Sequence, residues 1–186
     1  WESGLVNDDS MLTLQLKADL NCPRSSGMGR LFDGVYALLT GRETVTYEGQ
    51  GAILLEAMAE QADFPLPLSF YEEDGVLRFD HRPLIRALWE HRHNGVPAEQ
   101  LAAAFMDALV QMGLTQCRRA REVTGLNRVV LSGGVFQNMY LLPRLLDALT
   151  ADGFEAYHHS RVSANDEGIS LGQLVIADAL LRKEAL

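Results

Sequence analysis

Apolar residues recur at helical spacing along much of this 186-residue chain. Over residues 28–39 they fall at intervals of three and four, and Gly41 follows at a position where helices commonly end. A second pattern of this kind covers residues 50–62 and is closed by Pro65. We therefore predict two helices in this part of the chain, joined through a turn at residues 47–50.

The middle of the chain carries a hairpin pattern. Residues 66–71 and 76–79 read as short strands, and the acidic stretch 72–75 between them contains a glycine. Asp80 is a preferred N-cap residue, so it predicts the start of a helix that ends near His93. The sequence thus predicts a β-hairpin followed directly by a helix.

The rest of the chain alternates helix and strand. The longest helix is predicted from Pro97 to about Val123, and after it come a short buried strand, a helix, a second strand and a last helix, at residues 128–131, 138–150, 154–158 and 167–183. This order predicts an α/β layer with parallel strands. The last helix should bury most of its apolar residues, which are Ile169, Leu171, Leu174, Val175, Ala177 and Leu181.

Composition narrows the class of protein. Hydrophobic residues make up 47% of the chain, enough to bury a core in one compact unit or two small lobes. The net charge of −9 disfavours a nucleic-acid surface, which needs clustered Lys and Arg, and leaves small molecules or proteins as partners.

The cysteine content and the length of the apolar runs predict a cytoplasmic protein with no membrane segment. Cys22 and Cys117 lack metal-ligand spacing, and no apolar run reaches the roughly 20 residues that span a bilayer. Because the chain opens with Trp1 in an ordinary mixed segment, we expect it to be cut from something longer.

Candidate chemistry begins where the strand at 128–131 ends. Gly133 and Gly134 lie between this strand and a predicted helix. Glycine has no Cβ to block the approach of a phosphate to backbone N–H groups, and a helix start adds a positive dipole. A plain strand-to-helix turn that needs glycine conformations is the alternative.

A second polar junction follows the next predicted strand, at residues 165–168. Asp166 there could bind a metal ion or cap the last helix, and capping is the more common role for such an Asp. In an open α/β sheet, ligands collect at the carboxyl ends of strands, so two neighbouring junctions of this kind favour a nucleotide site.

The remaining charged residues have simpler interpretations. Arg30 and Asp33 lie one helical turn apart and can form a surface pair, and Glu48 is typical of a solvated loop. The five histidines lack the spacing of paired metal ligands and read as surface residues. The arginines at 78–92 and 118–121 read as solvated helix faces. Motifs of acyl-serine hydrolases and P-loop enzymes are missing from the sequence.

Three separated motifs give the chain a family resemblance. They are residues 28–33 with 47–50, residues 131–138, and residues 165–168 with 171–173. In this order, and over nearly the whole chain, they resemble the C-terminal part of the HypF carbamoyltransferases.

The resemblance implies an α/β fold, the C-terminal lobe of an actin-like or sugar-kinase-like (ASKHA) ATPase fold that is shared with TsaD and the antibiotic O-carbamoyltransferases. Residues 1–186 would be the C-terminal portion of a TsaD-like carbamoyltransferase domain, with 66–95 as a hairpin–helix insertion. The acylphosphatase-like, zinc-finger-like and YrdC-like regions of the family are absent from this sequence.

The resemblance also implies site residues. In the family the nucleotide lies between two lobes, and the residues expected beside ATP are Asp33, at the ribose hydroxyls, Glu48, Gly49, Gly133, Gly134 and Asn138. Asp166 would be the carboxylate ligand of a divalent metal, which could be Fe, Mg or Zn, with its histidine ligands in the first half of the domain. No catalytic residue is assigned.

The activity that the resemblance implies has two steps. The YrdC-like region makes carbamoyl adenylate from carbamoyl phosphate and ATP, and the ASKHA domain passes the carbamoyl group to the C-terminal cysteine of HypE for the cyanide ligands of [NiFe]-hydrogenase. We expect this chain alone to be inactive. Two alternatives stay open, a TsaD-like tRNA-modifying protein, which the acidic charge disfavours, and a non-catalytic nucleotide-binding or docking lobe.

Overall fold

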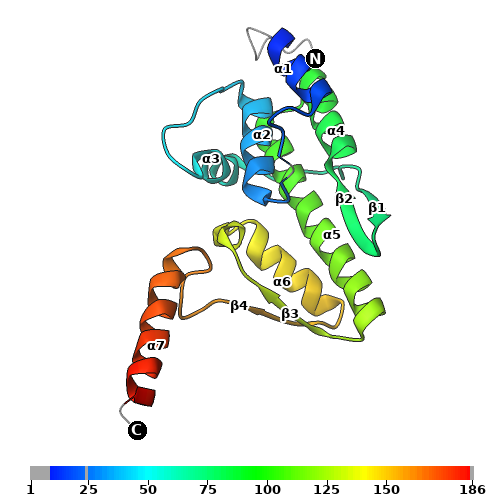
Figure 1. The fold of residues 1–186 in the computed structure, drawn as a ribbon. Helices are drawn as coiled ribbons and strands as arrows, with labels where there is room; N and C mark the ends of the chain where they lie inside the picture. The colour runs from blue at the N-terminus through cyan, green and yellow to red at the C-terminus, as the bar shows by residue number, and fades with distance from the viewer. Residues whose placement is uncertain (1–8, 24, 185–186) are drawn as a thin grey trace.

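Helices form most of the computed structural model, which describes residues 9–23 and 25–184 (Figure 1). In chain order the elements are α1 (Asp9–Ala18), α2 (Met28–Thr40), α3 (Gln50–Met58), β1 (Ser69–Glu73), β2 (Val76–Asp80), α4 (His81–His93), α5 (Ala98–Thr124), β3 (Arg128–Leu131), the 3-10 helix η1 (Gly134–Gln137), α6 (Leu141–Ala151), β4 (Glu155–His158) and α7 (Glu167–Glu184).

Helix α5 is the centre of the hydrophobic core. It has 27 residues and is therefore about 40 Å long. Helices α2, α3, α4 and α6 pack around it (Figure 1). Leu101, Phe105 and Met106 of α5 are completely buried, and the ring of Phe105 meets the ring of Phe32 edge-on with centroids 5.1 Å apart. Asp33 lies on α2 and Asn138 just before α6, so both are attached to this core.

Most helix ends agree with the sequence predictions. Helix α2 ends at Gly41 in the left-handed conformation, with φ of 71°. Asp80 caps α4 by accepting a hydrogen bond from the backbone N–H of Arg82 at 3.1 Å. Helix α3, predicted to reach residue 62, ends at Met58. The reason is a long-range bond, because the N–H of Glu60 donates to the carbonyl of Glu99 at the start of α5.

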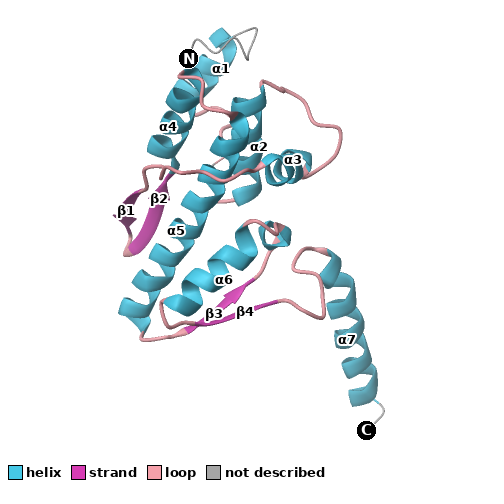
Figure 2. Cartoon of the chain, turned by 180° about the vertical axis from the view of Figure 1, so that it is seen from behind, coloured by secondary structure: helices cyan, strands magenta, loops and turns pink. Residues whose placement is uncertain are grey.

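The predicted hairpin is confirmed, with a shift of its first strand. Strands β1 and β2 are antiparallel, and the two-residue turn Asp74–Gly75 has positive φ at both positions. This tight turn starts the pairing at Glu73 and Val76, so β1 covers 69–73 and not 66–71. The hairpin lies beside α5 (Figure 2), to which the Glu72 carboxylate is joined by Arg119 at 2.6 Å. Its status as an insertion stays a prediction.

Strands β3 and β4 form the predicted parallel pair, with α6 as the crossover between them. Helix α6 covers one face of this two-stranded sheet (Figure 2). The prediction of a buried strand β3 is wrong for most of its residues. Only Leu131 is buried, whereas Val130 is 68% exposed, because no described element covers the second face.

The predicted burial of the last helix is also wrong. Helix α7 extends away from the other elements (Figure 1), and its apolar residues, including Leu174 at 68% exposure, face solvent in the described part of the chain. Helix α1 was not predicted, and Met11, Leu14 and Leu16 on it are exposed as well. Among the described helices none is both long and apolar enough for a transmembrane span.

Candidate functional site

The two polar junctions predicted to be neighbours lie side by side. Parallel strands β3 and β4 end at the same edge of their sheet, so the chain segments that leave them meet. The N–H of Gly133 donates to the carbonyl of Ala164 at 2.8 Å, and the amide of Gln137 donates to the hydroxyl of Ser163 at 3.5 Å. These bonds fix the glycine turn against the segment that leads into α7.

The two glycines of the turn have different reasons to be glycine. Gly133 has φ of 109° and ψ of 158°, a conformation that residues with a Cβ rarely adopt, and its N–H is bonded to Ala164. A Cβ at Gly134 would lie 3.7 Å from the Cβ of Asn165, an ordinary contact. No described residue accepts a hydrogen bond from the N–H of Gly134 or of Val135. Gly133 is thus explained by backbone geometry, whereas Gly134 leaves an open N–H at the turn.

Asn138 is a buried cap of α6. Its side chain is 7% exposed, and its Oδ1 accepts hydrogen bonds from the backbone N–H groups of Tyr140 at 3.0 Å and Leu141 at 2.8 Å. Its Nδ2 lies 3.5 Å from the sulfur of Met106 on α5. Helix α6 therefore begins at Leu141 and not at residue 138. The nucleotide contact expected of Asn138 stays a prediction, and both polar atoms of its side chain already have partners within the protein.

Asp33 lies at a close approach between α2 and α3. A Cβ at Gly51 of α3 would lie only 3.0 Å from Oδ1 of Asp33 and 3.3 Å from Cβ of Tyr36. Gly51 thus permits α3 to pack against α2 beside this carboxylate. Glu48 and Gly49 form the exposed turn that precedes α3, and Gly49 has φ of 80°.

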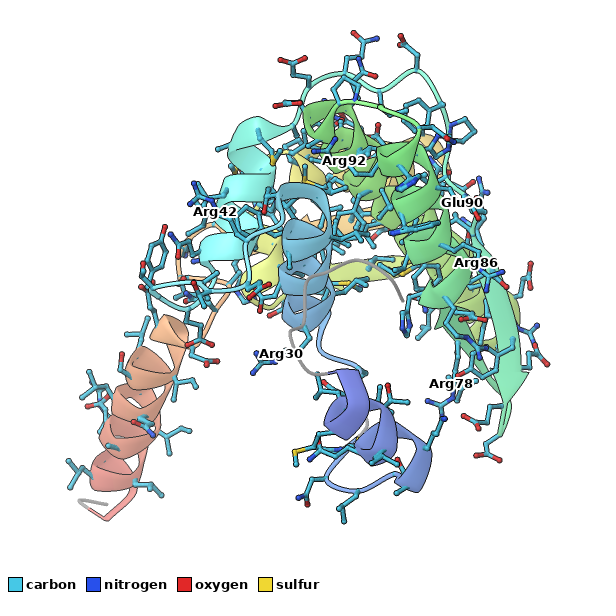
Figure 3. All side chains as sticks on the ribbon, turned by 90° about the horizontal axis from the view of Figure 1, so that it is seen from above. Arg30, Arg42, Arg78, Arg86, Glu90 and Arg92 are labelled. Carbon is cyan, nitrogen blue, oxygen red and sulfur yellow. The ribbon has the colours of Figure 1, made fainter. Side chains whose placement is uncertain are left out.

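Arg30 forms the surface pair with Asp33 that was predicted, at 3.9 Å. Its side chain is 86% exposed and extends away from α2 (Figure 3). The carboxylate of Asp33 is itself partly exposed, so the pair leaves Asp33 accessible to a ligand.

Glu56 links the α2–α3 side to the glycine turn. Its Oε1 accepts a hydrogen bond from the backbone N–H of Met139 at 2.8 Å. This contact, like the close approach at Gly51, was not predicted, because Glu56 reads in the sequence as an ordinary polar position of a helix. It holds the segment after η1 against α3, so the helix that follows the turn at Glu48 and Gly49 is in direct contact with the segment that follows the glycine turn.

Asn165, and not Asp166, caps α7. Oδ1 of Asn165 accepts hydrogen bonds from the hydroxyl of Ser163 at 2.6 Å and from the N–H of Glu167 at 3.0 Å. The cap interpretation of Asp166 is therefore wrong. Asp166 is exposed, and its carboxylate has no hydrogen bond or ion pair with any described residue.

A complete metal site does not form within residues 9–23 and 25–184. No group of three or more His, Cys, Asp or Glu side chains there could hold a metal ion. Asp166 offers one free carboxylate oxygen ligand, which fits a hard divalent cation whose other ligands come from elsewhere.

The sequence predicts a plain surface role for His159, and the structure gives this residue a specific partner. Its Nε2 lies 2.9 Å from Oγ of Ser132, the residue that precedes the glycine turn. His158 is different, since its Nδ1 lies 2.9 Å from the carbonyl oxygen of His159 and can only donate to it. His159 therefore belongs to the same loop cluster as Gly133 and Gly134.

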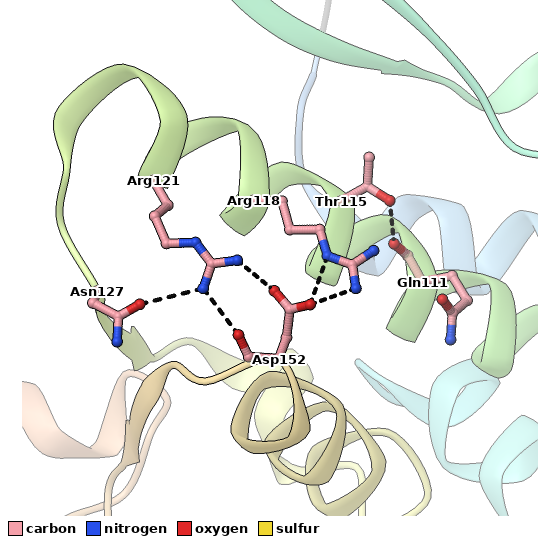
Figure 4. Close-up of polar contacts among 6 residues, drawn as sticks. All are labelled: Gln111, Thr115, Arg118, Arg121, Asn127 and Asp152. Atoms are coloured by element: carbon pink, nitrogen blue, oxygen red, sulfur yellow. Dashed lines mark hydrogen bonds and ion pairs between the residues drawn. The ribbon is translucent and has the colours of Figure 1, made fainter.

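The arginine-rich helix faces are more than solvated surface. Arg118 and Arg121 of α5 both bind the carboxylate of Asp152, at 2.9 Å and 2.7 Å, and Arg121 also binds Asn127 at 3.3 Å (Figure 4). The hydrogen bond from Arg118 holds the pKa of Asp152 below its usual value. On α4, Nε of Arg92 (Figure 3) donates to the carbonyl of Leu39 at 3.1 Å. These arginines join helices and turns of the core.

A hollow of about 530 Å³ lies beyond the end of α3. It is lined by residues 59–62 and by Asp107, Tyr140 and Arg144. The guanidinium of Arg144 stacks on the ring of Tyr140 at 3.6 Å, and burial raises the pKa of Tyr140. None of the residues predicted to bind nucleotide lines it.

A model of the family described as "Carbamoyltransferase, Kae1-like Domain, second subdomain" matches residues 5–173 of the chain. The carbamoyltransferase HypF of Synechocystis sp. is 36% identical over 155 residues, which are 82% of this chain and 19% of that protein. A carbamoyltransferase HypF homolog of Cupriavidus necator is 36% identical over 172 residues, 87% of this chain and 43% of that protein. The chain thus spans less than half the length of these relatives.

Solved structures give the same result. The crystal structure of full-length HypF in the phosphate- and nucleotide-bound form superposes with a TM-score of 0.83 at 38% identity, covering 94% of this chain and 24% of that one. The T. kodakarensis HypF structure superposes with a TM-score of 0.73 at 24% identity, covering 93% of this chain and 22% of that one. The second match supports the fold alone.

Proposed function

This chain belongs to the family of HypF carbamoyltransferases, and from that premise we propose that it supplies one side of the nucleotide and metal site at which a carbamoyl group is transferred. The fold class expected from the sequence, an α/β lobe of the actin-like carbamoyltransferase fold, is confirmed by the match to HypF structures. The relatives are named carbamoyltransferases, which supports an enzymatic role for the protein to which this chain belongs.

The observation that carries the proposal is the open N–H of Gly134. It lies at the edge of a parallel pair of strands, next to the N–H of Val135, and no described residue accepts a hydrogen bond from either group. Gly134 is exposed, so its N–H can reach a ligand, and neighbouring backbone N–H groups without a protein partner are well suited to bind an anion. Gly134 has no packing need for a bare Cα, which supports a role in approach of a phosphate.

The other residues have roles that follow from their positions. Asp33 presents a half-exposed carboxylate that can accept hydrogen bonds from ribose hydroxyls, and Glu48 and Gly49 border the same side. Asn138 holds the turn by capping α6, so its contribution is the position of the turn as much as any direct contact.

The metal would be held in part by Asp166. A divalent cation supplies positive charge that stabilises the phosphate groups of the nucleotide. The free carboxylate of Asp166 is a suitable ligand for it, and the remaining ligands would come from outside the residues described.

The reaction has two parts in this proposal. A separate region forms carbamoyl adenylate from carbamoyl phosphate and ATP. The thiolate of the C-terminal cysteine of HypE then attacks the carbamoyl carbon, the bond from that carbon to the phosphate oxygen breaks, and AMP leaves. This chain binds the adenylate during the second part. It is expected to show no ATP cleavage that depends on carbamoyl phosphate, since the adenylating region lies elsewhere.

The two alternatives to a carbamoyltransferase, a tRNA-modifying protein and a non-catalytic lobe, do not have equal support. Family membership sets aside the tRNA-modifying alternative. A nucleotide-binding lobe without catalysis of its own is compatible with the proposal, because the chain spans only 19–43% of the relatives cited. A cytoplasmic location belongs to the proposal as well.

Titration calorimetry with ATP and Mg²⁺ tests the site. The chain is expected to bind ATP, and Gly134→Val should weaken binding at least about tenfold, because the added side chain blocks the approach to the open N–H. Gly172→Val is the matched control, since no atom lies within 4 Å of a Cβ built at Gly172 on α7. Equal affinity for ATP in the folded Gly134→Val variant and the parent would contradict the proposal.

A further inference from the structure

Ser132 and His159 form a hydrogen-bonded pair at the edge of the glycine turn. Oγ of Ser132 and Nε2 of His159 are 2.9 Å apart, and both residues are exposed. The hydroxyl of Ser132 does not cap the helix that follows, because the N-cap residue of η1 is Gly133 and no side chain caps η1. The fold therefore does not explain why a hydroxyl and an imidazole meet here.

The backbone fixes the pair in place. Leu131 of β3 and His158 of β4 are paired in the parallel ladder, so the next residue of each strand leaves the sheet at the same level. The bond from the N–H of Gly133 to the carbonyl of Ala164 closes the two segments against each other. The Ser132 hydroxyl is thus held one residue before the turn whose Gly134 N–H is open.

The hydrogen-bonding capacity of the pair depends on the imidazole tautomer. A serine hydroxyl has one hydrogen to donate and two lone pairs that accept. If Nε2 of His159 carries the proton, it donates to Oγ, and the hydroxyl hydrogen of Ser132 is free to donate to an anion. In the other tautomer the hydroxyl hydrogen is taken by Nε2, and only lone pairs would face the anion.

The geometry points to Ser132 as a further phosphate ligand of the nucleotide and to His159 as the positioning residue that orients its hydroxyl. This inference rests on the proposed function, because the phosphate is that of the nucleotide bound at Gly134. It adds the hydroxyl of Ser132, two residues before Gly134, to the backbone N–H groups of Gly134 and Val135 as a donor for this phosphate.

Substitutions separate the contact from its positioning. Ser132→Ala removes the donor, and His159→Phe keeps a ring but removes Nε2. Each should weaken ATP binding by about threefold to tenfold, the range of one hydrogen bond. His159→Gln can place an amide N–H near Nε2 and should restore affinity to within about twofold of the parent. His158→Phe is the matched control, since the side chain of His158 has no hydrogen bond to another side chain among the described residues, and this variant should bind ATP as the parent does.

The double variant tests whether His159 acts through Ser132. Ser132→Ala with His159→Phe should bind ATP no more weakly than Ser132→Ala alone. Additive losses would mean that His159 contacts the phosphate itself and would overturn its role as a positioning residue. In the parent with ATP at about pH 8, where an ordinary imidazole is neutral, the ¹⁵N shifts of His159 should show the proton on Nε2. A proton on Nδ1 would overturn the inference.

The same measurements distinguish failure of the inference from failure of the proposed function. If the parent does not bind ATP, the proposed function fails and the inference fails with it. If the parent binds ATP and Gly134→Val does not, but Ser132→Ala and His159→Phe bind as the parent does, the nucleotide site stands and only the role of the pair is wrong.

Discussion

Asn165 and Asp166 are neighbours in the sequence with separate tasks. Asn165 turns its side chain back to cap α7, and its Oδ1 is fully used by Ser163 and Glu167. Asp166 is left exposed with no partner among the described residues. A carboxylate that is not required by the fold, at the edge where the glycine turn lies, is available to a ligand.

The two residues should therefore respond differently to substitution. Asn165→Ala should lower the stability of α7 by about 1 kcal/mol through loss of the cap, measured as a loss of helical signal on mild heating. Asp166→Asn should leave that signal unchanged. In a full-length carbamoyltransferase that carries this region, Asp166→Asn should abolish carbamoyl transfer, because the metal requires the charge. Full transfer activity in that variant would remove Asp166 from the metal site.

Some of these residues could be found in the sequence and others could not. The glycine pair and Asp166 lie in motifs that follow strands, and the adjacency of the two junctions follows from parallel pairing. Gly51, Glu56 and the pair of Ser132 with His159 depend on contacts between distant segments. No local pattern marks such positions, since their meaning arises only when the helices and loops are packed.

At the scale of elements, one carboxylate joins α5 to the turn between α6 and β4. Asp152 follows the last residue of α6 and receives Arg118 and Arg121 from α5 (Figure 4). Asn127, just before β3, is bonded to Arg121 and donates to the carbonyl of Gly153 at 2.6 Å. The cluster positions the start of β3 and of β4, and hence the edge at which their loops meet.

This cluster predicts a dependence of stability on pH. The hydrogen bond from Arg118 lowers the pKa of Asp152 in the folded chain. A group with a lowered folded pKa stabilises the fold above its unfolded pKa, about 4 for Asp, and loses that contribution as the pH falls through the folded pKa. Asp152→Asn should thus lower the urea midpoint at neutral pH, and the difference from the parent should shrink below about pH 4.

Asp147→Asn is the control for this measurement. Asp147 is an exposed carboxylate on α6 with no ion pair among the described residues. Its substitution should leave the urea midpoint close to that of the parent at every pH. A midpoint for Asp152→Asn that equals the parent's at neutral pH would show that the cluster adds nothing to stability.

Helix ends show where sequence patterns are sufficient. The ends of α2 and α4 are set by local chemistry, a left-handed glycine and an Asp cap, and both were predicted. The end of α3 is set by the bond from Glu60 to Glu99, and the start of α6 by the buried cap of Asn138, so both predictions missed by several residues. A long-range bond overrides the local pattern at α3, whereas at α6 a side-chain cap that bonds the N–H groups two and three residues later moves the start of the helix.

At the scale of the whole molecule, the core is concentrated around α5, and two apolar surfaces lie outside it. One face of the β3–β4 sheet and the apolar residues of α7 are exposed in the described part of the chain. Periodicity correctly marked α7 as a helix with apolar residues. The periodicity does not show whether another part of this chain covers the apolar residues of α7, because a hydrophobic pattern does not identify the surface that packs against it.

The contrast between α6 and α7 can be measured with one substitution in each. Leu145 of α6 is 5% exposed and packs in the core, whereas Leu174 of α7 faces solvent. Leu145→Glu should cost about 3 kcal/mol or more, by leaving a cavity and burying a charge, and should unfold much of the chain at 25 °C. Leu174→Glu should leave the denaturation midpoint unchanged. A large loss of stability in Leu174→Glu would show that α7 is packed in solution.

The exposed apolar side of α7 also bears on how the chain behaves in a test tube. Attraction between apolar surfaces strengthens on warming and in sulfate salts, because both make water a poorer solvent for them. Concentrated solutions of the chain should therefore turn cloudy on gentle heating, below the temperature at which the core melts, and clear again on cooling. Leu174→Glu should raise the clouding temperature and the ammonium sulfate concentration needed to precipitate the protein, so solubility would report on a helix that thermal melting does not detect.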